Sequence, residues 1–158
     1  MNKNEGYNKI LSEEWIDWVE QSNNSEGTRE KEIFPFIQSW LEDLKPKVLA
    51  DIGCGQGDCS RFKSAKTNYV GVEPSLRLID RAKQLYPSHE FLEGSAYTIP
   101  LENSSADAVM SVWVWSHLED LKKAAEEMFR ILKTKGRFLI ITASPDMYDE
   151  RKTFYKEF

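Results

Sequence analysis

Two acidic residues and three glycines in the first half of the chain have the spacing of a ligand-binding turn. Asp51 ends an apolar run, glycines follow at positions 53, 55 and 57, and Glu73 ends a second apolar run. Glycine lets the backbone turn tightly and lets a ligand approach where a Cβ would clash. Glu73 lies twenty residues after Gly53, the spacing expected for a carboxylate that binds ribose hydroxyls. These residues therefore predict a nucleotide-like ligand beyond the carboxyl ends of two parallel strands.

The glycine spacing separates two classes of ligand. A dinucleotide site requires the pattern G-x-G-x-x-G, which would place a glycine at position 58, where Asp58 stands instead. Asp51 and Asp58 would also bring negative charge against a pyrophosphate. The same carboxylates suit a ligand that carries a sulfonium and an ammonium. The pattern D-x-G-x-G-x-G therefore favours S-adenosylmethionine over a nicotinamide dinucleotide and its oxidoreductases.

With these residues in view, the sequence closely resembles the class I methyltransferases, of the type that acts on small molecules. The resemblance covers residues 45–143 and includes, in the family's order, Tyr69–Glu73, Phe91–Ala96, Ile99–Ser111 and Leu132–Ile141. It implies a three-layer, Rossmann-like α/β fold with a mostly parallel sheet. It also implies in-line transfer of a methyl group from S-adenosylmethionine to a small-molecule acceptor, with S-adenosylhomocysteine as the product.

The resemblance further implies which residues hold the cofactor. In the family, the glycine turn contacts the methionine end of the cofactor, and the acid after the second strand binds the ribose. The expected cofactor-binding residues are Asp51, Gly53, Cys54, Gly55, Gly57, Glu73, Pro74, Ser95, Ala96 and Ser111. Pro74 and Leu76 are expected to flank the adenine. Ser95 stands where many members carry an acid that binds the adenine amino group.

The residues after the fourth strand are expected to face the acceptor. Trp113 and Trp115 are candidates for lining an acceptor pocket, with packing in the core as the alternative. His117 aligns with a histidine that is common in small-molecule members, and it is the candidate base for an acceptor that must lose a proton. A structural histidine in the first turn of a helix is the alternative. Residues 111–114 read Ser-Val-Trp-Val, so they lack the Asn/Asp-Pro-Pro-aromatic motif of enzymes that methylate the exocyclic amines of bases.

The elements that position these residues are expected to alternate between strand and helix. Strands are expected at Val48–Ile52 and Tyr69–Glu73, near residues 91–93 and 106–111, and at Arg137–Thr142. Helices are expected at Thr28–Leu44, at Asp58–Ser64, at Ser75–Leu85, and after a capping box formed by Ser116 and Glu119. The expected inner faces of the last two helices are Leu76, Ile79, Ala82 and Leu85, and Leu118, Leu121, Ala125, Met128 and Leu132. In the first helix, Pro35 predicts a kink or a restart.

Length and composition predict a single domain. A chain of 158 residues is long enough for one domain with its own core. The net charge of −5 argues against a polyanionic substrate held by nonspecific electrostatics, so nucleic acid is not an expected partner. No signal peptide or membrane-length apolar run is visible, and cytoplasmic localisation is expected. Cys54 and Cys59 have no matching Cys/His pair, so no metal site is expected. The expected division is an N-terminal segment at 1–27, the cofactor-binding domain at 28–143 and a tail at 144–158. The N-terminal segment either packs onto the domain or covers the cofactor as a lid.

The end of the sequence departs from the family's pattern. Members usually continue beyond the fifth strand into a further helix and an antiparallel strand pair, and the fold is expected to lack this pair. The fifth strand would then be an exposed apolar edge, to be covered by a homodimer or by another partner unless the chain is truncated. A noncatalytic module that binds the cofactor or a partner chain is therefore the alternative to an enzyme.

Overall fold

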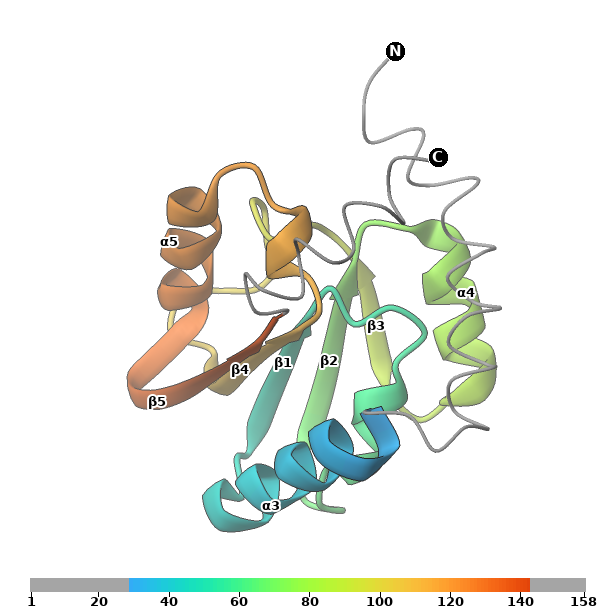
Figure 1. The fold of residues 1–158 in the computed structure, drawn as a ribbon. Coiled ribbons are helices and arrows are strands. Elements are labelled where there is room, and N and C mark those ends of the chain that lie inside the picture. Colours follow the sequence, from blue (N-terminus) through green and yellow to red (C-terminus); the bar gives the residue numbers. More distant parts are fainter. Residues whose placement is uncertain (1–28, 143–158) are drawn as a thin grey trace.

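The protein is represented by a computed structural model, which describes residues 29–142 (Figure 1). The candidate lid at 1–27 and the tail at 144–158 lie outside the described residues.

A five-stranded sheet forms the centre of the molecule, and all of its strand pairs are parallel. Its order is β3-β2-β1-β4-β5, so β1 lies in the middle and the order reverses between β1 and β4. The strands are β1 (Val48–Ile52), β2 (Asn68–Glu73), β3 (Glu90–Glu93), β4 (Ala106–Val112) and β5 (Leu132–Ile141). A ligand of such a sheet is expected beyond the carboxyl ends of the strands, at the reversal point.

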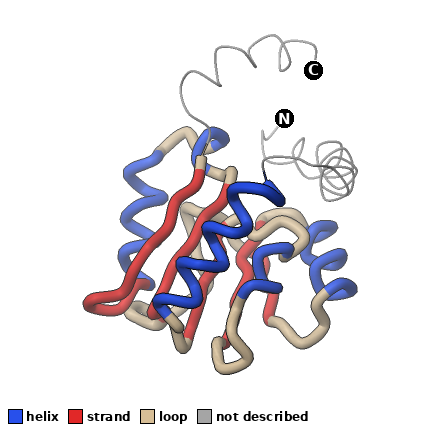
Figure 2. The backbone as a smooth tube through the Cα atoms, turned by 60° about the horizontal axis from the view of Figure 1, so that its bottom comes forward, coloured by secondary structure: helices blue, strands red, loops and turns tan. Residues whose placement is uncertain are grey.

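Helices cover both faces of the sheet (Figures 1 and 2), which confirms the three-layer α/β fold. The longer helices are α3 (Phe34–Leu44), α4 (Leu76–Leu85) and α5 (Leu121–Ile131), and the short ones are η2 (Arg29–Ile33), η3 (Asp58–Phe62) and η4 (Trp115–His117). One core cluster joins Ile37 of α3 and Ile79 of α4 to β2 and β4. The other joins Met128 of α5 to Ile52 and Val72. Residues on alternating sides of the same strands thus supply both cores.

The helix expected at Thr28–Leu44 is divided in two. A π-helical turn, η2, precedes α3, and Pro35 lies in the first turn of α3. Proline is tolerated there because the N–H that it lacks would have no partner within the helix. The structure therefore supports a restart rather than a kink. The helix after the glycine turn is a 3₁₀ helix that ends at Phe62, two residues before the expected end.

The inner face expected for α4 is partly wrong. Ser75 is the N-cap, and its side chain accepts from the Leu78 N–H over 3.5 Å. Ile79 and Ala82 are buried as expected, but the side chains of Leu76 and Leu85 are 58% and 41% exposed. Leu78 takes the third buried position instead.

The capping box expected at Ser116 is also wrong. Ser116 lies in η4, and α5 begins at Leu121 behind the N-cap Asp120, whose carboxylate accepts from the Lys123 N–H over 2.9 Å. The buried face consists of Ala124, Met128 and Ile131. Leu121 was expected on this face, but its side chain is 49% exposed.

Strand β5 begins at Leu132, directly after α5 and five residues before the expected start. The pairing with β4 is irregular between Ala106 and Ala108, and Lys135 adopts a φ of 66° in this stretch. Within residues 29–142, β5 pairs with β4 alone and its other edge is open.

Candidate functional site

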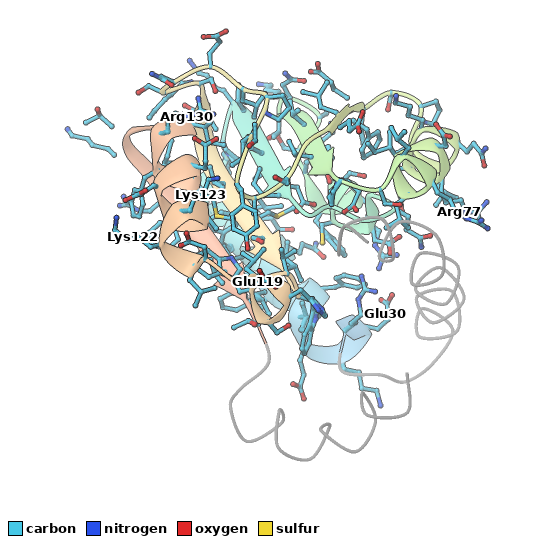
Figure 3. All side chains as sticks on the ribbon, turned by 90° about the horizontal axis from the view of Figure 1, so that it is seen from above. Glu30, Arg77, Glu119, Lys122, Lys123 and Arg130 are labelled. Carbon is cyan, nitrogen blue, oxygen red and sulfur yellow. The ribbon has the colours of Figure 1, made fainter. Side chains whose placement is uncertain are left out.

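Parallel strands place their carboxyl ends at one edge of the sheet, and the predicted cofactor residues lie there. Asp51 lies near the end of β1, Glu73 ends β2, and Ser111 lies near the end of β4. The glycine turn that follows β1 lies at the same edge. Figure 3 looks down on this edge, with Arg77 of α4 at the right of the view and Glu119, which follows β4, near its middle.

The glycine turn adopts a backbone that few other residues tolerate. Gly53, Gly55 and Gly57 have φ values of 75°, 56° and 83°. The N–H groups of Gly53 and Cys54 both donate to the Val72 carbonyl, over 2.7 and 3.2 Å, so the turn is anchored to β2. A Cβ on Gly53 would collide with the side chain of Val114. The positive φ values favour glycine at all three positions, and Gly53 also permits the close contact with the loop after β4.

Glu73 is buried and oriented by two backbone donors. Its side chain is 4% exposed. Oε2 accepts from the Gly55 N–H over 3.1 Å, and Oε1 accepts from the Ser75 N–H over 3.0 Å. Burial raises the pKa of Glu73 to about 7, although these two hydrogen bonds lower it. Each carboxylate oxygen can accept a second hydrogen bond, so the group can bind two hydroxyls while it stays anchored.

Asp51 is the second buried carboxylate, and a tyrosine holds it. Oδ2 accepts from the Tyr69 hydroxyl over 2.7 Å. Burial raises the pKa of Asp51 to about 7, the hydrogen bond from Tyr69 opposes the rise, and the charges of Glu73 and Asp58 add to it. Sequence reasoning missed Tyr69, because the contact depends on the register that places Asp51 opposite Gly71.

The structure pairs Asp58 with groups behind the glycine turn. Its carboxylate forms an ion pair with Arg29 at 3.6 Å and accepts from Gln56 Nε2 and from the Tyr86 hydroxyl, both over 3.4 Å. Its side chain is only 8% exposed. The negative charge of Asp58 is thus balanced by Arg29, unlike the charges of Asp51 and Glu73.

The remaining predicted cofactor residues differ in their exposure and in their hydrogen bonds. Pro74 is exposed beside Glu73, and Ala96 is buried. The Ser95 hydroxyl accepts from the Tyr97 N–H over 3.2 Å, and the Ser111 hydroxyl donates to the Ile52 carbonyl over 2.9 Å. Both serines therefore stabilise the loops of the site, and their contacts to a cofactor stay predictions.

The two candidate acceptor residues and the candidate base His117 lie between β4 and α5, and the two tryptophans pack against different core clusters. Trp113 has a φ of 62° and packs against the core cluster of α3 and α4. Trp115 packs against the cluster of α5. The packing of the two indoles on different cores favours the structural alternative, and their role in a pocket stays a prediction.

His117 lies in η4 rather than in the first turn of a long helix, and its side chain is exposed. Although His117 keeps contact with solvent, partial burial of its ring lowers its pKa below the usual value of 6.5, which favours the neutral imidazole at pH 7. Its role as a base stays a prediction.

A second tyrosine that sequence reasoning missed joins two loops of the site. The Tyr97 hydroxyl accepts from the N–H groups of Glu119 and Asp120, over 2.8 and 3.2 Å. It thereby links the loop after β3 to the segment that leads into α5. No local sequence signal identifies this contact, because it joins residues 22 and 23 positions apart.

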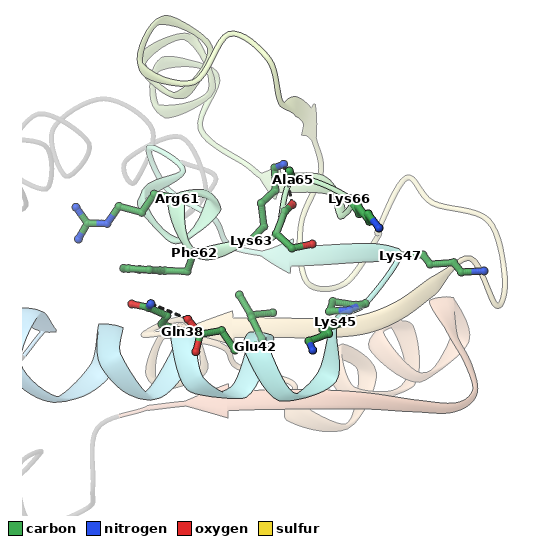
Figure 4. Close-up of a pocket in the computed structure, with 12 residues that line it drawn as sticks. Gln38, Glu42, Lys45, Lys47, Arg61, Phe62, Lys63, Ala65 and Lys66 are labelled. Atoms are coloured by element: carbon green, nitrogen blue, oxygen red, sulfur yellow. Dashed lines mark hydrogen bonds between the residues drawn. The ribbon is translucent and has the colours of Figure 1, made fainter.

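An open groove of about 960 Å³ lies elsewhere, between α3 and the segment that precedes β2 (Figure 4). Lys45 and Lys47 border it just before β1, and Lys63 and Lys66 border it before β2. The groove therefore lies at the amino ends of these strands, whereas the glycine turn and both buried carboxylates lie at the carboxyl ends.

Within the described range 29–142, no group of histidine, cysteine and acidic side chains is arranged to hold a metal ion. No described helix is both long enough and apolar enough to cross a membrane.

Comparison with known proteins shows what the chain is similar to. Residues 50–140, more than half of the chain, match the family model described as a methyltransferase domain. The ubiquinone/menaquinone biosynthesis C-methyltransferase UbiE of Campylobacter jejuni is 32% identical over 108 residues, covering 63% of this chain and 45% of the relative. The demethylmenaquinone methyltransferase of Thermotoga maritima is 26% identical over 106 residues, covering 65% and 46%.

A solved structure from Thermotoga maritima shows the same fold. It is described as a SAM-dependent methyltransferase and possible histamine N-methyltransferase, and it superposes with a TM-score of 0.69 at 23% identity. The match covers 95% of this chain and 70% of that one. The present chain spans about half the length of the two curated relatives.

Proposed function

The chain belongs to the class I methyltransferase domain family, whose cofactor is S-adenosylmethionine, and from this premise we propose that it methylates a small-molecule acceptor. The observation that carries the cofactor-binding half of this proposal is the anchored carboxylate of Glu73. It accepts from the Gly55 N–H and can still accept hydrogen bonds from the hydroxyls of a ribose.

The residues at the carboxyl edge fit the chemistry of this cofactor. Glu73 suits two ribose hydroxyls, and Asp51 suits an ammonium group, because no described cation is paired with either carboxylate. Pro74 and Leu76 supply exposed apolar surface beside Glu73, where an adenine ring would be flanked. The exposure of Leu76, which was unexpected for a core residue, is consistent with this role.

The proposed mechanism requires little chemistry from the protein. When bound, S-adenosylmethionine supplies an electrophilic methyl group on a sulfonium, whose leaving group needs no protonation. The glycine turn and the carboxylates of Asp51 and Glu73 would bind and orient the cofactor, and the loop of Trp113 and Trp115 would exclude water. Alignment of this kind contributes much of the rate in displacement reactions.

The names of the two curated relatives suggest the first acceptor to test. One is named for C-methylation in quinone biosynthesis and the other for demethylmenaquinone. Methylation at carbon releases a proton, so it requires a base. His117 is our candidate for that base, because its neutral imidazole lies in the loop after β4.

Calorimetric titration with S-adenosylhomocysteine, with NAD as the control ligand, tests the cofactor assignment. We expect micromolar binding of the first ligand alone. Glu73→Gln should lower the affinity by about ten- to a hundredfold, because it loses a charged acceptor of hydrogen bonds. Glu93→Gln is the matched control, since Glu93 lies opposite Glu73 at the end of β3 and is exposed. Equal affinities of the wild type and Glu73→Gln would remove the ribose assignment.

The alternative is a noncatalytic module that binds the cofactor or a partner chain. It is favoured by Ser95, which replaces the acid that many members use for the adenine, and by the edge of β5 that stays unpaired among residues 29–142. Cofactor binding without methyl transfer to any acceptor in a quinol-containing panel would favour it. As a partner for the open edge we propose a second copy of this chain; this homodimer and a cytoplasmic location stay predictions.

A further inference from the structure

Tyr69 and Asp51 form a buried pair at the centre of the proposed site. The Tyr69 hydroxyl donates to Asp51 Oδ2 over 2.7 Å, and the two residues are 1% and 2% exposed. Tyr69 lies two residues before Gly71 on β2, and Gly71 is the register partner of Asp51 on β1. Alternate residues of a strand share a face, so the tyrosine side chain extends along the strand toward the ligand edge.

Packing independent of Asp51 holds the tyrosine ring. Tyr69 meets the ring of Phe91 edge-on at 5.9 Å and lies 5.5 Å from the ring of His89. A Cβ on Gly71 would lie 2.7 Å from both Cys54 Sγ and Phe91 Cδ1, so the neighbouring space is filled. The hydroxyl is therefore pre-positioned, and it costs little further ordering to hold the carboxylate.

The other groups around Asp51 disfavour its negative charge. Glu73 on β2 and Asp58 on η3 are acids whose charges oppose that of Asp51, and the neighbouring thiols of Cys54 in the glycine turn and Cys59 on η3 bring no positive charge. The nearby cations are Arg29 of η2 and Arg61 of η3, which form ion pairs with Asp58 and Glu30. Burial and these charges raise the pKa of Asp51 to about 7, whereas the hydrogen bond from Tyr69 lowers it. Tyr69 thus supplies the side-chain donor that favours the ionised carboxylate.

We propose that Tyr69 is a positioning residue of the cofactor site, which holds Asp51 in one orientation and in the ionised form that binds the ammonium group of the cofactor. This inference rests on the proposed function, because it requires that the chain bind S-adenosylmethionine. It assigns to Tyr69 no contact with the reacting atoms.

The test is the pH profile of S-adenosylhomocysteine binding by the wild type, Tyr69→Phe and Tyr86→Phe. Tyr69→Phe should weaken binding about tenfold at pH 7 and move the midpoint of the profile to higher pH, so that the loss shrinks to about twofold near pH 9. Tyr86→Phe removes a hydroxyl that donates to Asp58 over 3.4 Å, and it should bind like the wild type. A purely structural role for Tyr69 would lower the affinity equally at every pH.

The outcomes separate the two proposals. A folded wild type that binds no S-adenosylhomocysteine overturns the proposed function and this inference with it. Wild-type binding that Tyr69→Phe leaves unchanged, or weakens equally at every pH, overturns the inference alone.

Should Tyr69→Phe fail to fold, ¹³C NMR titration of the Asp51 carboxyl in the wild type decides the matter. A midpoint near 7 that falls when S-adenosylhomocysteine is added supports the inference. A midpoint that the ligand does not move overturns it.

Discussion

At the scale of single residues, the site places two buried carboxylates side by side without a described cation for either. Burial raises the pKa values of both Asp51 and Glu73 to about 7. Ionisation of these groups therefore costs free energy in the protein without its cofactor. A ligand that brings an ammonium to Asp51 and hydroxyls to Glu73 offsets this cost. The two buried carboxylates thus lower the free energy of unfolding of the protein without ligand and favour ligand binding.

This trade-off predicts that Asp51→Asn stabilises the protein at alkaline pH. The folded-state pKa of Asp51, about 7, lies above the ordinary value of 3.8, so the folded protein binds this proton more tightly than the unfolded chain. The resulting stabilisation is complete below about pH 4 and is lost as pH rises toward 7. Asparagine does not ionise, so the variant should exceed the wild type by roughly 1–3 kcal/mol near pH 8 and differ little near pH 4.

Urea unfolding at the two pH values measures this difference. Asp80→Asn, on the exposed surface of α4, is the matched control and should show no such pH dependence. A stability difference between Asp51→Asn and the wild type that is the same at both pH values would contradict the prediction.

The residues that could be predicted from sequence are those whose role depends on local spacing. Asp51, the glycines and Glu73 follow one another over a short stretch, and the structure brings them to one edge. Tyr69 contacts Asp51 on the neighbouring strand, and Tyr97 joins two loops. These contacts depend on the folded structure, so spacing in the sequence does not predict them. Ser95 and Ser111 were placed by resemblance, and their hydroxyls bond to the protein's own backbone.

At the scale of elements, the start of α5 shows a tertiary contact overriding a local signal. Ser116 and Glu119 have the spacing of a capping box, but the N–H groups of Glu119 and Asp120 donate to the Tyr97 hydroxyl instead. The helix can therefore begin only after Asp120, whose carboxylate accepts from the Lys123 N–H. The first four strands were predicted more accurately, because their continuous apolar character reflects burial on both faces.

We predict that Asp120→Ala destabilises the protein by about 1 kcal/mol, since it removes the acceptor for an N–H in the first turn of α5. Ser116→Ala should change the free energy of unfolding by less than about 0.3 kcal/mol, because Ser116 does not cap the helix. Chemical denaturation of the two variants measures both values. A larger loss of stability in Ser116→Ala than in Asp120→Ala would contradict this prediction and would indicate that Ser116 caps the helix.

At the scale of the whole molecule, residues 29–142 cover the sheet well in its centre and less well at β5. The buried core clusters draw on β1, β2, β3 and β4, and β5 adds only partly buried residues, while α5 and β5 leave an aromatic pair exposed. Phe129 and Phe138 are 59% and 50% exposed, and their rings meet edge-on at 5.4 Å. The mostly parallel sheet was predictable through family resemblance, but the degree of exposure at this edge required the structure.

We predict that this edge mediates self-association of the 158-residue chain. An open strand edge presents unpaired backbone groups, and exposed aromatic side chains beside it add apolar surface for a second copy. Phe138→Lys should shift the chain toward monomer by placing a charge in that surface, with about a tenfold weaker association. Phe36→Lys is the matched control, because Phe36 lies on α3 and is 55% exposed. Sedimentation velocity over a range of concentrations distinguishes the species. A wild type that stays monomeric throughout, or two variants that associate equally, would show that β5 is not the contact between copies.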